Sequence, residues 1–167
     1  ATEDELLFQG SVREPWMIYL GDELDPALAA GPSNARSAAG RLEVTVIDKE
    51  VQEDARRLKW RAGASTTTFY FGRGQAWDAS GLSVAGGVLS FALKRLDVSA
   101  DSLLLTEQCG TGCDASVDII SALGKQERGR WTQFALPLSC LESQGVDMTG
   151  LTSPFGLSTA GTVSLEL

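Results

Sequence analysis

The stretch RLEVTVID, residues 41–48, shows the pattern that decides the fold of this chain. Leu42, Val44 and Val46 alternate with polar neighbours, and most of the apolar residues are β-branched. A period of two puts successive side chains on opposite faces of a β-strand, and β-branched residues are common in strands. The stretch is therefore predicted to be a strand with one apolar and one polar face, which is typical of antiparallel sheets.

Similar runs recur along the whole chain. Further strands are predicted in PWMIYLGDE (15–23), TTTFYFG (66–72), GGVLSFALKRLDV (86–98), DSLLLTEQ (101–108), RWTQFALPL (130–138), SPFGLST (153–159) and TVSLEL (162–167). The chain has 18 glycines, many of them between these runs, where they supply turns. Many short strands at regular spacing predict an all-β fold, an antiparallel β-sandwich of the jelly-roll type.

A charged run, KEVQEDARRLKWRAG at residues 49–63, still ends in the alternation of a strand. Leu58 and Trp60 fall on one face and basic side chains on the other, so we expect a half-exposed strand whose basic face lies on the surface. Trp16, Trp60 and Trp131 all lie within strand patterns and are predicted to be core residues.

Three segments do not follow the strand pattern. Residues 25–40 contain small residues and few large apolar ones, and they are predicted to form a long surface crossover loop. Helical signals are confined to SVDIISALG at residues 116–124 and SCLESQG at residues 139–145.

Length and composition point to one domain covering residues 1–167. A chain of 167 residues with 43% apolar residues can close a single core. It contains no apolar run long enough to span a membrane and no signal-peptide pattern. Since it also begins without Met, we expect a processed product or a piece of a larger multidomain chain.

The charge balance restricts the partners. Lys and Arg number 14 against 22 Asp and Glu, which gives a formal charge of −8. This argues against a nucleic acid or an anionic membrane and favours a neutral ligand. The chain has no His, which excludes Ser-His-Asp and Cys-His catalysis and imidazole metal ligands.

One loop, GRGQAWDASG at residues 72–81, combines an aromatic with several polar residues. Arg73, Gln75, Trp77 and Asp78 are the carbohydrate-contact candidates, because an indole ring stacks on a pyranose while amides and carboxylates bind its hydroxyls. The alternative, that Trp77 folds back to cap the edge of the sandwich, is also compatible with the pattern. The loop lacks the following helix and the Gly-Lys-Ser/Thr ending of a phosphate-binding loop.

The chain resembles a known family from about Leu7 to its end. The resemblance rests on the order of several short motifs, any one of which is weak alone: Gln52-Glu53-Asp54-Ala55, Trp60, Cys109-x-x-x-Cys113, Trp131, Pro137-Leu138-Ser139-Cys140 and Pro154-Phe155. In this order they are similar to the galactose-binding-like domain at the C-terminus of bacterial family 3 glycoside hydrolases, the exo-acting β-glucosidase and β-glucanase group.

The resemblance implies a non-catalytic accessory domain with the fold of a carbohydrate-binding module. It implies that this chain is no enzyme by itself, that the catalytic carboxylates lie upstream in the same polypeptide, and that those catalytic domains are its partners. A β-glucan or oligosaccharide is a further expected partner, and the expected location is periplasmic or extracellular. A free-standing β-glucan-binding lectin is the alternative.

The cysteines are read in that oxidising context, where closely spaced pairs more often form a disulfide than a redox centre. We favour a disulfide between Cys109 and Cys113, with Cys140 buried as a small apolar residue. A bond from Cys109 to Cys140, or three reduced cysteines, are the alternatives.

The acidic residues do not indicate a catalytic or metal site. Asp114 and Asp118 flank a predicted helix start and are expected to cap it or to stay solvated. Modules related to the resembled family often carry calcium, but Gln9 stands where a liganding acid would be expected. No metal, no cofactor and no catalytic residue is therefore assigned.

Overall fold

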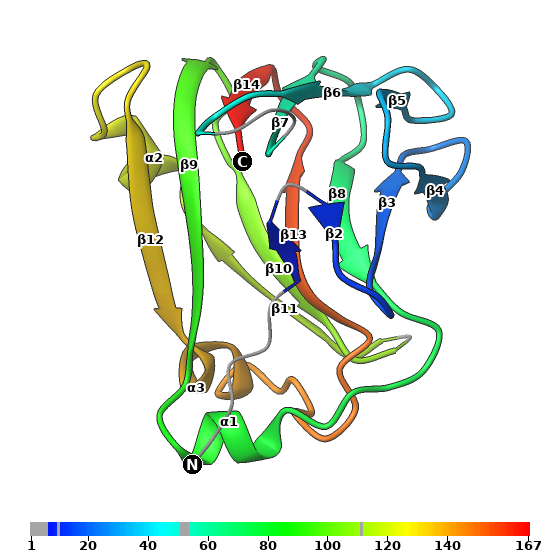
Figure 1. Ribbon diagram of the computed structural model, residues 1–167, viewed down its shortest axis with the longest axis vertical. Helices are drawn as coiled ribbons and strands as arrows, with labels where there is room; N and C mark the ends of the chain where they lie inside the picture. Colours follow the sequence, from blue (N-terminus) through cyan, green and yellow to red (C-terminus); the bar gives the residue numbers. More distant parts are fainter. Residues whose placement is uncertain (1–6, 10, 51–53, 111) are drawn as a thin grey trace.

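Two antiparallel β-sheets stacked face to face form the molecule (Figure 1). The computed structural model describes residues 7–9, 11–50, 54–110 and 112–167. Across the first sheet the strands are, in order, β11 (Asp114–Asp118), β10 (Leu104–Gln108), β13 (Ser153–Thr159), β8 (Thr67–Gly72), β3 (Met17–Gly21) and β4 (Leu28–Ala30). Across the second they are β12 (Trp131–Pro137), β9 (Val88–Val98), β14 (Val163–Glu166), β7 (Ala55–Trp60), β6 (Leu42–Ile47) and β5 (Ala35–Arg36).

The remaining elements are short. β1 (Phe8–Gln9) pairs with β2 (Ser11–Val12), and the helices are α1 (Ser80–Val84), α2 (Ile120–Gly124) and α3 (Leu138–Glu142). None of the helices in the described ranges is long and apolar enough to cross a bilayer. β13 and β14, the last two strands in the sequence, lie in the middle of the first and second sheet respectively.

The predicted all-β sandwich is confirmed, and every strand predicted from periodicity is present. The charged run also behaves as predicted in β7, where Leu58 and Trp60 are buried and Arg57 and Lys59 are exposed. Arg56 is the exception, because it shares the inward face with Leu58 and is itself buried. Periodicity places a side chain on a face but does not reveal that a long cation fills an inward position.

The predictions of loops and helices were partly wrong. Residues 25–40 cross from one sheet to the other, as a crossover does, but they contain the edge strands β4 and β5. The predicted helix at 116–124 is only half a helix, since β11 occupies its first part and pairs with β10 along five residues. This ladder outweighs a weak local helix signal. α1 was not predicted, whereas α3 matches the signal at 139–145 in part.

The core lies between the sheets. Trp16 and Trp60 are buried there as predicted, with 1% and 0% of their surface exposed, and the Trp60 indole N–H donates a hydrogen bond to the Thr67 carbonyl at 3.0 Å. Trp131 is half-exposed, so its prediction as a core residue was wrong. It lies on β12, the edge strand of the second sheet, and no other strand of that sheet pairs with its outer side in the described part of the chain.

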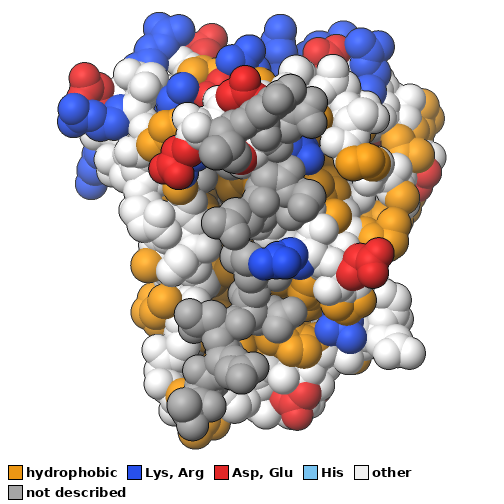
Figure 2. All heavy atoms as spheres, viewed as in Figure 1, with side chains coloured by type: hydrophobic (Ala, Val, Ile, Leu, Met, Phe, Trp, Pro, Cys, Tyr) orange, Lys and Arg blue, Asp and Glu red, His pale blue; other side chains and the backbone are white. Residues whose placement is uncertain are grey.

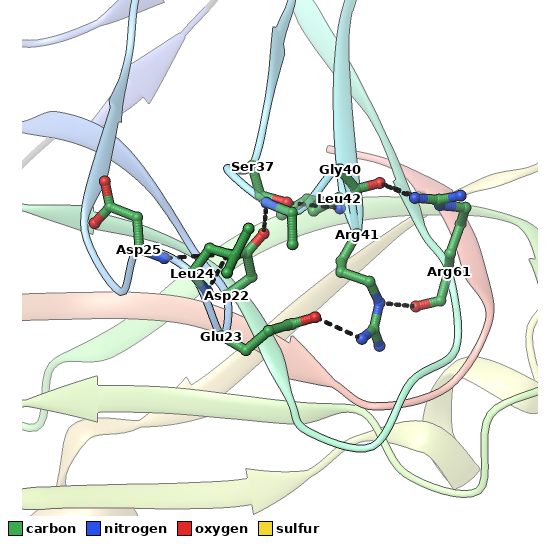
Figure 3. A network of polar contacts seen from close by, with 10 residues as sticks. Asp22, Glu23, Leu24, Asp25, Ser37, Gly40, Arg41, Leu42 and Arg61 are labelled. Atoms are coloured by element: carbon green, nitrogen blue, oxygen red, sulfur yellow. Dashed lines mark hydrogen bonds and ion pairs between the residues drawn. The ribbon is translucent and has the colours of Figure 1, made fainter.

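The crossover loop is held by Asp22, which is 7% exposed (Figure 3). One carboxylate oxygen accepts hydrogen bonds from the N–H groups of Leu24 and Asp25, at 3.0 and 3.3 Å, and the other accepts one from Ala39 at 2.7 Å. Burial acts to raise the pKa of Asp22, but these hydrogen bonds and one from Ser37 hold that pKa below its ordinary value. A single buried carboxylate thus ties the end of β3 to the turn before β6.

Candidate functional site

A groove with a volume of about 710 Å³ opens between β9 of the second sheet and β8 and β13 of the first. It extends from the residues around α1 to the connection between β6 and β7, which are the lower and upper ends in Figure 1. Figure 2 shows the same face of the molecule, where Lys and Arg side chains gather along the upper edge and hydrophobic side chains lie below them. The groove is the candidate binding site.

Aromatic rings form the middle of the groove. Phe91 of β9 packs edge-on against Phe155 of β13, with ring centroids 5.0 Å apart, and Phe71 of β8 lies 5.8 Å from Phe155. Phe91 also stacks on Phe134, at 5.5 Å and an interplanar angle of 9°. These contacts join the two sheets, and they give the groove rigid apolar walls.

Trp131 lines the upper end of the groove together with Lys49, Glu50 and Asp54 of the β6–β7 connection. The Lys49 ammonium lies 4.5 Å from the centre of its ring, and the Lys94 ammonium lies 5.6 Å from it. Cations at such distances are attracted to the indole face. This end therefore combines an accessible indole with charged groups that can form hydrogen bonds.

The four residues predicted to contact carbohydrate do not share one site in the structure. Trp77 lines the lower end of the groove, packs edge-on against Trp16 with centroids 5.4 Å apart, and exchanges backbone hydrogen bonds with Leu151. The Arg73 guanidinium lies over the Trp16 ring at 5.2 Å. Gln75 and Asp78 are exposed, and neither lines the groove.

Asp78 has a local role in the structure. It accepts hydrogen bonds from the N–H and the hydroxyl of Ser80, at 2.9 and 2.6 Å, at the start of α1. These bonds lower the pKa of Asp78. Of the four candidates, Trp77 alone therefore belongs to the groove that the described residues form, and it also packs in the cluster that caps this end of the sandwich.

Glu107 lines the groove and is fully buried, with 0% of its surface exposed. It lies on β10, two residues after the buried Leu105 and on the same inward face. Neither carboxyl oxygen has a hydrogen-bond partner among the described residues. Burial without a partner raises the pKa of Glu107 to about 8, so this side chain is mostly neutral at pH 7.

Asp118, like Asp78, has a local role in the structure. Asp118 accepts hydrogen bonds from Ile120 and Leu103, at 3.0 and 3.2 Å, and the bond from Ile120 is the largest cause that lowers its pKa. Asp118 is exposed just before α2, whose N-cap residue is Ile119 and which has no side-chain cap, and Asp114 lies exposed at the start of β11. Within the described ranges, no three acidic or cysteine side chains come together as metal ligands do. The motif residues Gln52 and Glu53 lie outside the described residues, as does the side chain of Gln9.

Cys109 and Cys113 are joined in a disulfide, with Cα atoms 5.0 Å apart. The Cys109 N–H donates to the Cys113 carbonyl at 2.7 Å, so the pair closes the β10–β11 hairpin. Cys140 is exposed, and its prediction as a buried residue was wrong. α3 turns Leu138 and Leu141 toward the core, and a residue two positions after Leu138 falls on the opposite side of a helix.

Sequence reasoning missed both Glu107 and Trp131 as groove residues. A signal for Glu107 was present, because Leu103, Leu105 and Glu107 share the period of a buried strand face, and a carboxyl at such a position is unusual. Trp131 gave no comparable signal, since its exposure depends on β12 being an edge strand.

Comparison with known proteins gives a clear match. The sequence profile of the Exop_C family, described as galactose-binding domain-like, matches residues 14–167. The chain is similar to the crystal structure of the extra C-terminal domain of the exo-1,3/1,4-β-glucanase ExoP from a Pseudoalteromonas species, with 19% identity, a TM-score of 0.76, and coverage of 96% of this chain and 86% of that one. Against whole ExoP the identity is 20% and the TM-score 0.76, and the match covers 99% of this chain but 20% of the enzyme.

A second group of similar structures consists of carbohydrate-binding modules. The family 30 module of the cellulosomal cellulase Cel9D-Cel44B of Clostridium thermocellum has 16% identity and a TM-score of 0.65, over 96% of this chain and 91% of the module. No curated protein matches the sequence. At these identities the structures share the fold, while the profile match covers nearly the whole chain.

Proposed function

The chain belongs to the Exop_C family of galactose-binding-like domains, and from this membership we propose that it is an accessory domain that binds β-glucan chains for a glycoside hydrolase. ExoP, whose extra C-terminal domain this chain resembles, is an exo-1,3/1,4-β-glucanase. The catalytic domains of such an enzyme are the proposed partners within the same polypeptide. A disulfide in a chain of this kind supports a periplasmic or extracellular location.

The groove is the observation that carries this proposal. It is concave, its walls are aromatic and apolar, and polar groups line its upper end. Carbohydrates need both kinds of surface, since pyranose rings stack on aromatic faces while their hydroxyls need hydrogen-bond partners. A net charge of −8 further favours an uncharged polysaccharide over an anionic one.

Trp131 is the proposed stacking platform. Its ring is half-exposed at the end of the groove, and the Lys49 ammonium lies 4.5 Å from its centre. A pyranose that stacks on this ring would take the place of the ammonium, and the freed lysine could then donate a hydrogen bond to a sugar hydroxyl. Trp77 would provide an apolar contact at the opposite end of the groove.

The loop at residues 73–78 is proposed to contribute in a second way. Gln75 and Asp78 are exposed and do not line the groove, so their amide and carboxylate are accessible to a neighbouring catalytic domain or its substrate. Such exposed loops on a rigid sandwich are where contacts of this kind are commonly placed.

Calorimetric titration with cellotetraose and laminaritetraose tests the proposed function. Replacing Trp131 with Ala should weaken binding about 2-fold to 12-fold, since an aromatic contact contributes about 0.5–1.5 kcal/mol. Tyr19→Ala is the matched control, because Tyr19 stacks on Tyr70 outside the groove. Absence of binding to both sugars, or equal affinity of the two variants, would reject the groove as a glucan site.

A further inference from the structure

Glu107 is a buried carboxyl whose hydrogen bonds are unmet. It exposes none of its surface, yet neither of its oxygens has a partner within the described ranges. Buried polar groups in proteins are almost always hydrogen-bonded, and each exception calls for a physical reason. Glu107 lines the groove but exposes none of its surface, so a ligand would reach the carboxyl only through a shift of the residues that cover it.

The neighbouring strands do not supply a partner. The pairing of β10 with β13 shifts register between Thr106 and Gln108, so Pro154 and Phe155 lie opposite Glu107. Pro154 has no N–H group to donate. Across β11 the paired residue is Ala115, which has no polar side-chain atom.

The described walls of this part of the groove are uncharged. The residues that line it from β9, β13 and α3 include Phe91, Phe155 and Leu138. The other charged residues that line the groove in the described part of the chain, Lys49, Glu50 and Asp54, belong to the β6–β7 connection. Burial is accordingly the cause that raises the pKa of Glu107 to about 8.

We propose that Glu107 determines the specificity of the groove by hydrogen-bonding a hydroxyl group of an uncharged sugar. This inference rests on the proposed function of the groove and names one residue that would distinguish among its ligands. The hydroxyl would supply the partner that Glu107 lacks among the described residues.

The chemistry of a neutral carboxyl fits a sugar hydroxyl. A protonated carboxyl has one O–H donor and a carbonyl acceptor, and a hydroxyl is likewise both donor and acceptor. An ionised carboxylate only accepts, and it would bring an unpaired charge into an apolar wall. The same group therefore favours neutral glucans and disfavours uronate-containing polysaccharides, whose carboxylates are a poor match for a buried acid.

The test measures binding of cellotetraose and laminaritetraose to the 167-residue chain between about pH 6 and 9.5, a range that brackets the pKa of Glu107. Wild-type affinity should be constant below about pH 7 and should fall as pH rises through about 8. Glu107→Gln keeps a donor and an acceptor and cannot ionise, so its affinity should not depend on pH. Glu107→Leu should bind about tenfold more weakly at about pH 6, since a hydrogen bond is lost.

Glu127→Gln is the control, because Glu127 is exposed and does not line the groove, and the wild-type pH profile should persist in this variant. Circular dichroism at each pH verifies folding. The ¹³Cδ resonance of Glu107 in the wild type gives a readout without substitution, and either sugar should shift it while the carboxyl is neutral.

The outcomes separate the inference from the function on which it rests. A wild-type chain that binds neither sugar while Glu107 is neutral rejects both. Binding that is equal in the wild type and Glu107→Leu, with an unmoved ¹³Cδ resonance, rejects the role of Glu107 and leaves the groove as a glucan site.

Discussion

Asp22 directly follows β3, and Glu107 lies on β10, both strands of the first sheet. Both carboxyl groups are buried, but their hydrogen-bonding surroundings are opposite. Asp22 accepts hydrogen bonds from three backbone N–H groups, whereas Glu107 has no partner in the part of the chain that the structure describes. The pKa of Asp22 is accordingly lowered, and that of Glu107 is raised to about 8. The comparison teaches that hydrogen-bond supply, more than burial alone, decides whether a buried acid fixes the fold or stays available to a ligand.

The largest expected effect is on the pH dependence of stability, through Glu107. Its folded pKa, about 8, lies above its ordinary value of 4.5, so between these values the folded state binds more protons than the unfolded state. Stability should therefore fall as pH rises through this window, by at most about 1.4 kcal/mol per pH unit. Glu107→Gln should remove this slope in urea unfolding measured at several pH values across the window.

The exposed Glu127→Gln is the control, and its slope should equal that of the wild type. A Glu107→Gln protein with the wild-type slope would mean that Glu107 is ionised at neutral pH. The contrast with Asp22 would then disappear.

The next effect concerns Asp22. Replacing it with Asn removes the charge and leaves one acceptor for three N–H donors, so the free energy of unfolding at about pH 7 should fall by about 2–3 kcal/mol. Because the folded pKa of Asp22 is lowered, its contribution exists above the unfolded pKa and is lost as pH falls through the folded pKa. Wild type and variant should thus converge in strong acid.

Urea unfolding at neutral pH and in acid measures both parts of this prediction. Asp101→Asn serves as an exposed reference that should change neither value. If Asp22→Asn were as stable as the wild type at neutral pH, the crossover loop would not depend on this carboxylate.

The smallest effect is expected at Asp78. This carboxylate also accepts a backbone N–H bond, and its pKa is also lowered, yet it is exposed. Solvent can replace the lost bonds, so Asp78→Asn should shift the Tm less than Asp22→Asn does. An equal shift in calorimetry would show that burial contributes nothing to the difference between the two aspartates.

The sequence was sufficient for the sandwich because strand periodicity is a local property. Residues such as Leu42 and Val44 carry the pattern within their own strand, and the structure buries both. β11 was misread because DASVD becomes a strand only through its ladder with β10, which no local signal encodes. Cys140 was misread for a related reason, since the direction in which α3 faces the core fixes its exposure.

The groove could be predicted less well than the fold. Its walls come from β8, β9, β13 and the β6–β7 connection, which are distant in the sequence, and the spacing of residues within one segment does not report such a meeting. Trp77, a carbohydrate-contact candidate from its loop composition, lines the groove, but Gln75 and Asp78 in the same loop do not. Loop composition indicates which residue types could contact a sugar, but the order of strands in the two sheets determines which residues line the groove.

The central places of β13 and β14 have a consequence for synthesis on the ribosome. β13 separates β10 from β8, and β14 separates β9 from β7, so each sheet remains in two parts until these late strands are made. The earlier strands emerge with unpaired edges and an open core, a state prone to aggregation or to capture by chaperones. Completion of both sheets must follow translation of residues 153–166, which form these two strands.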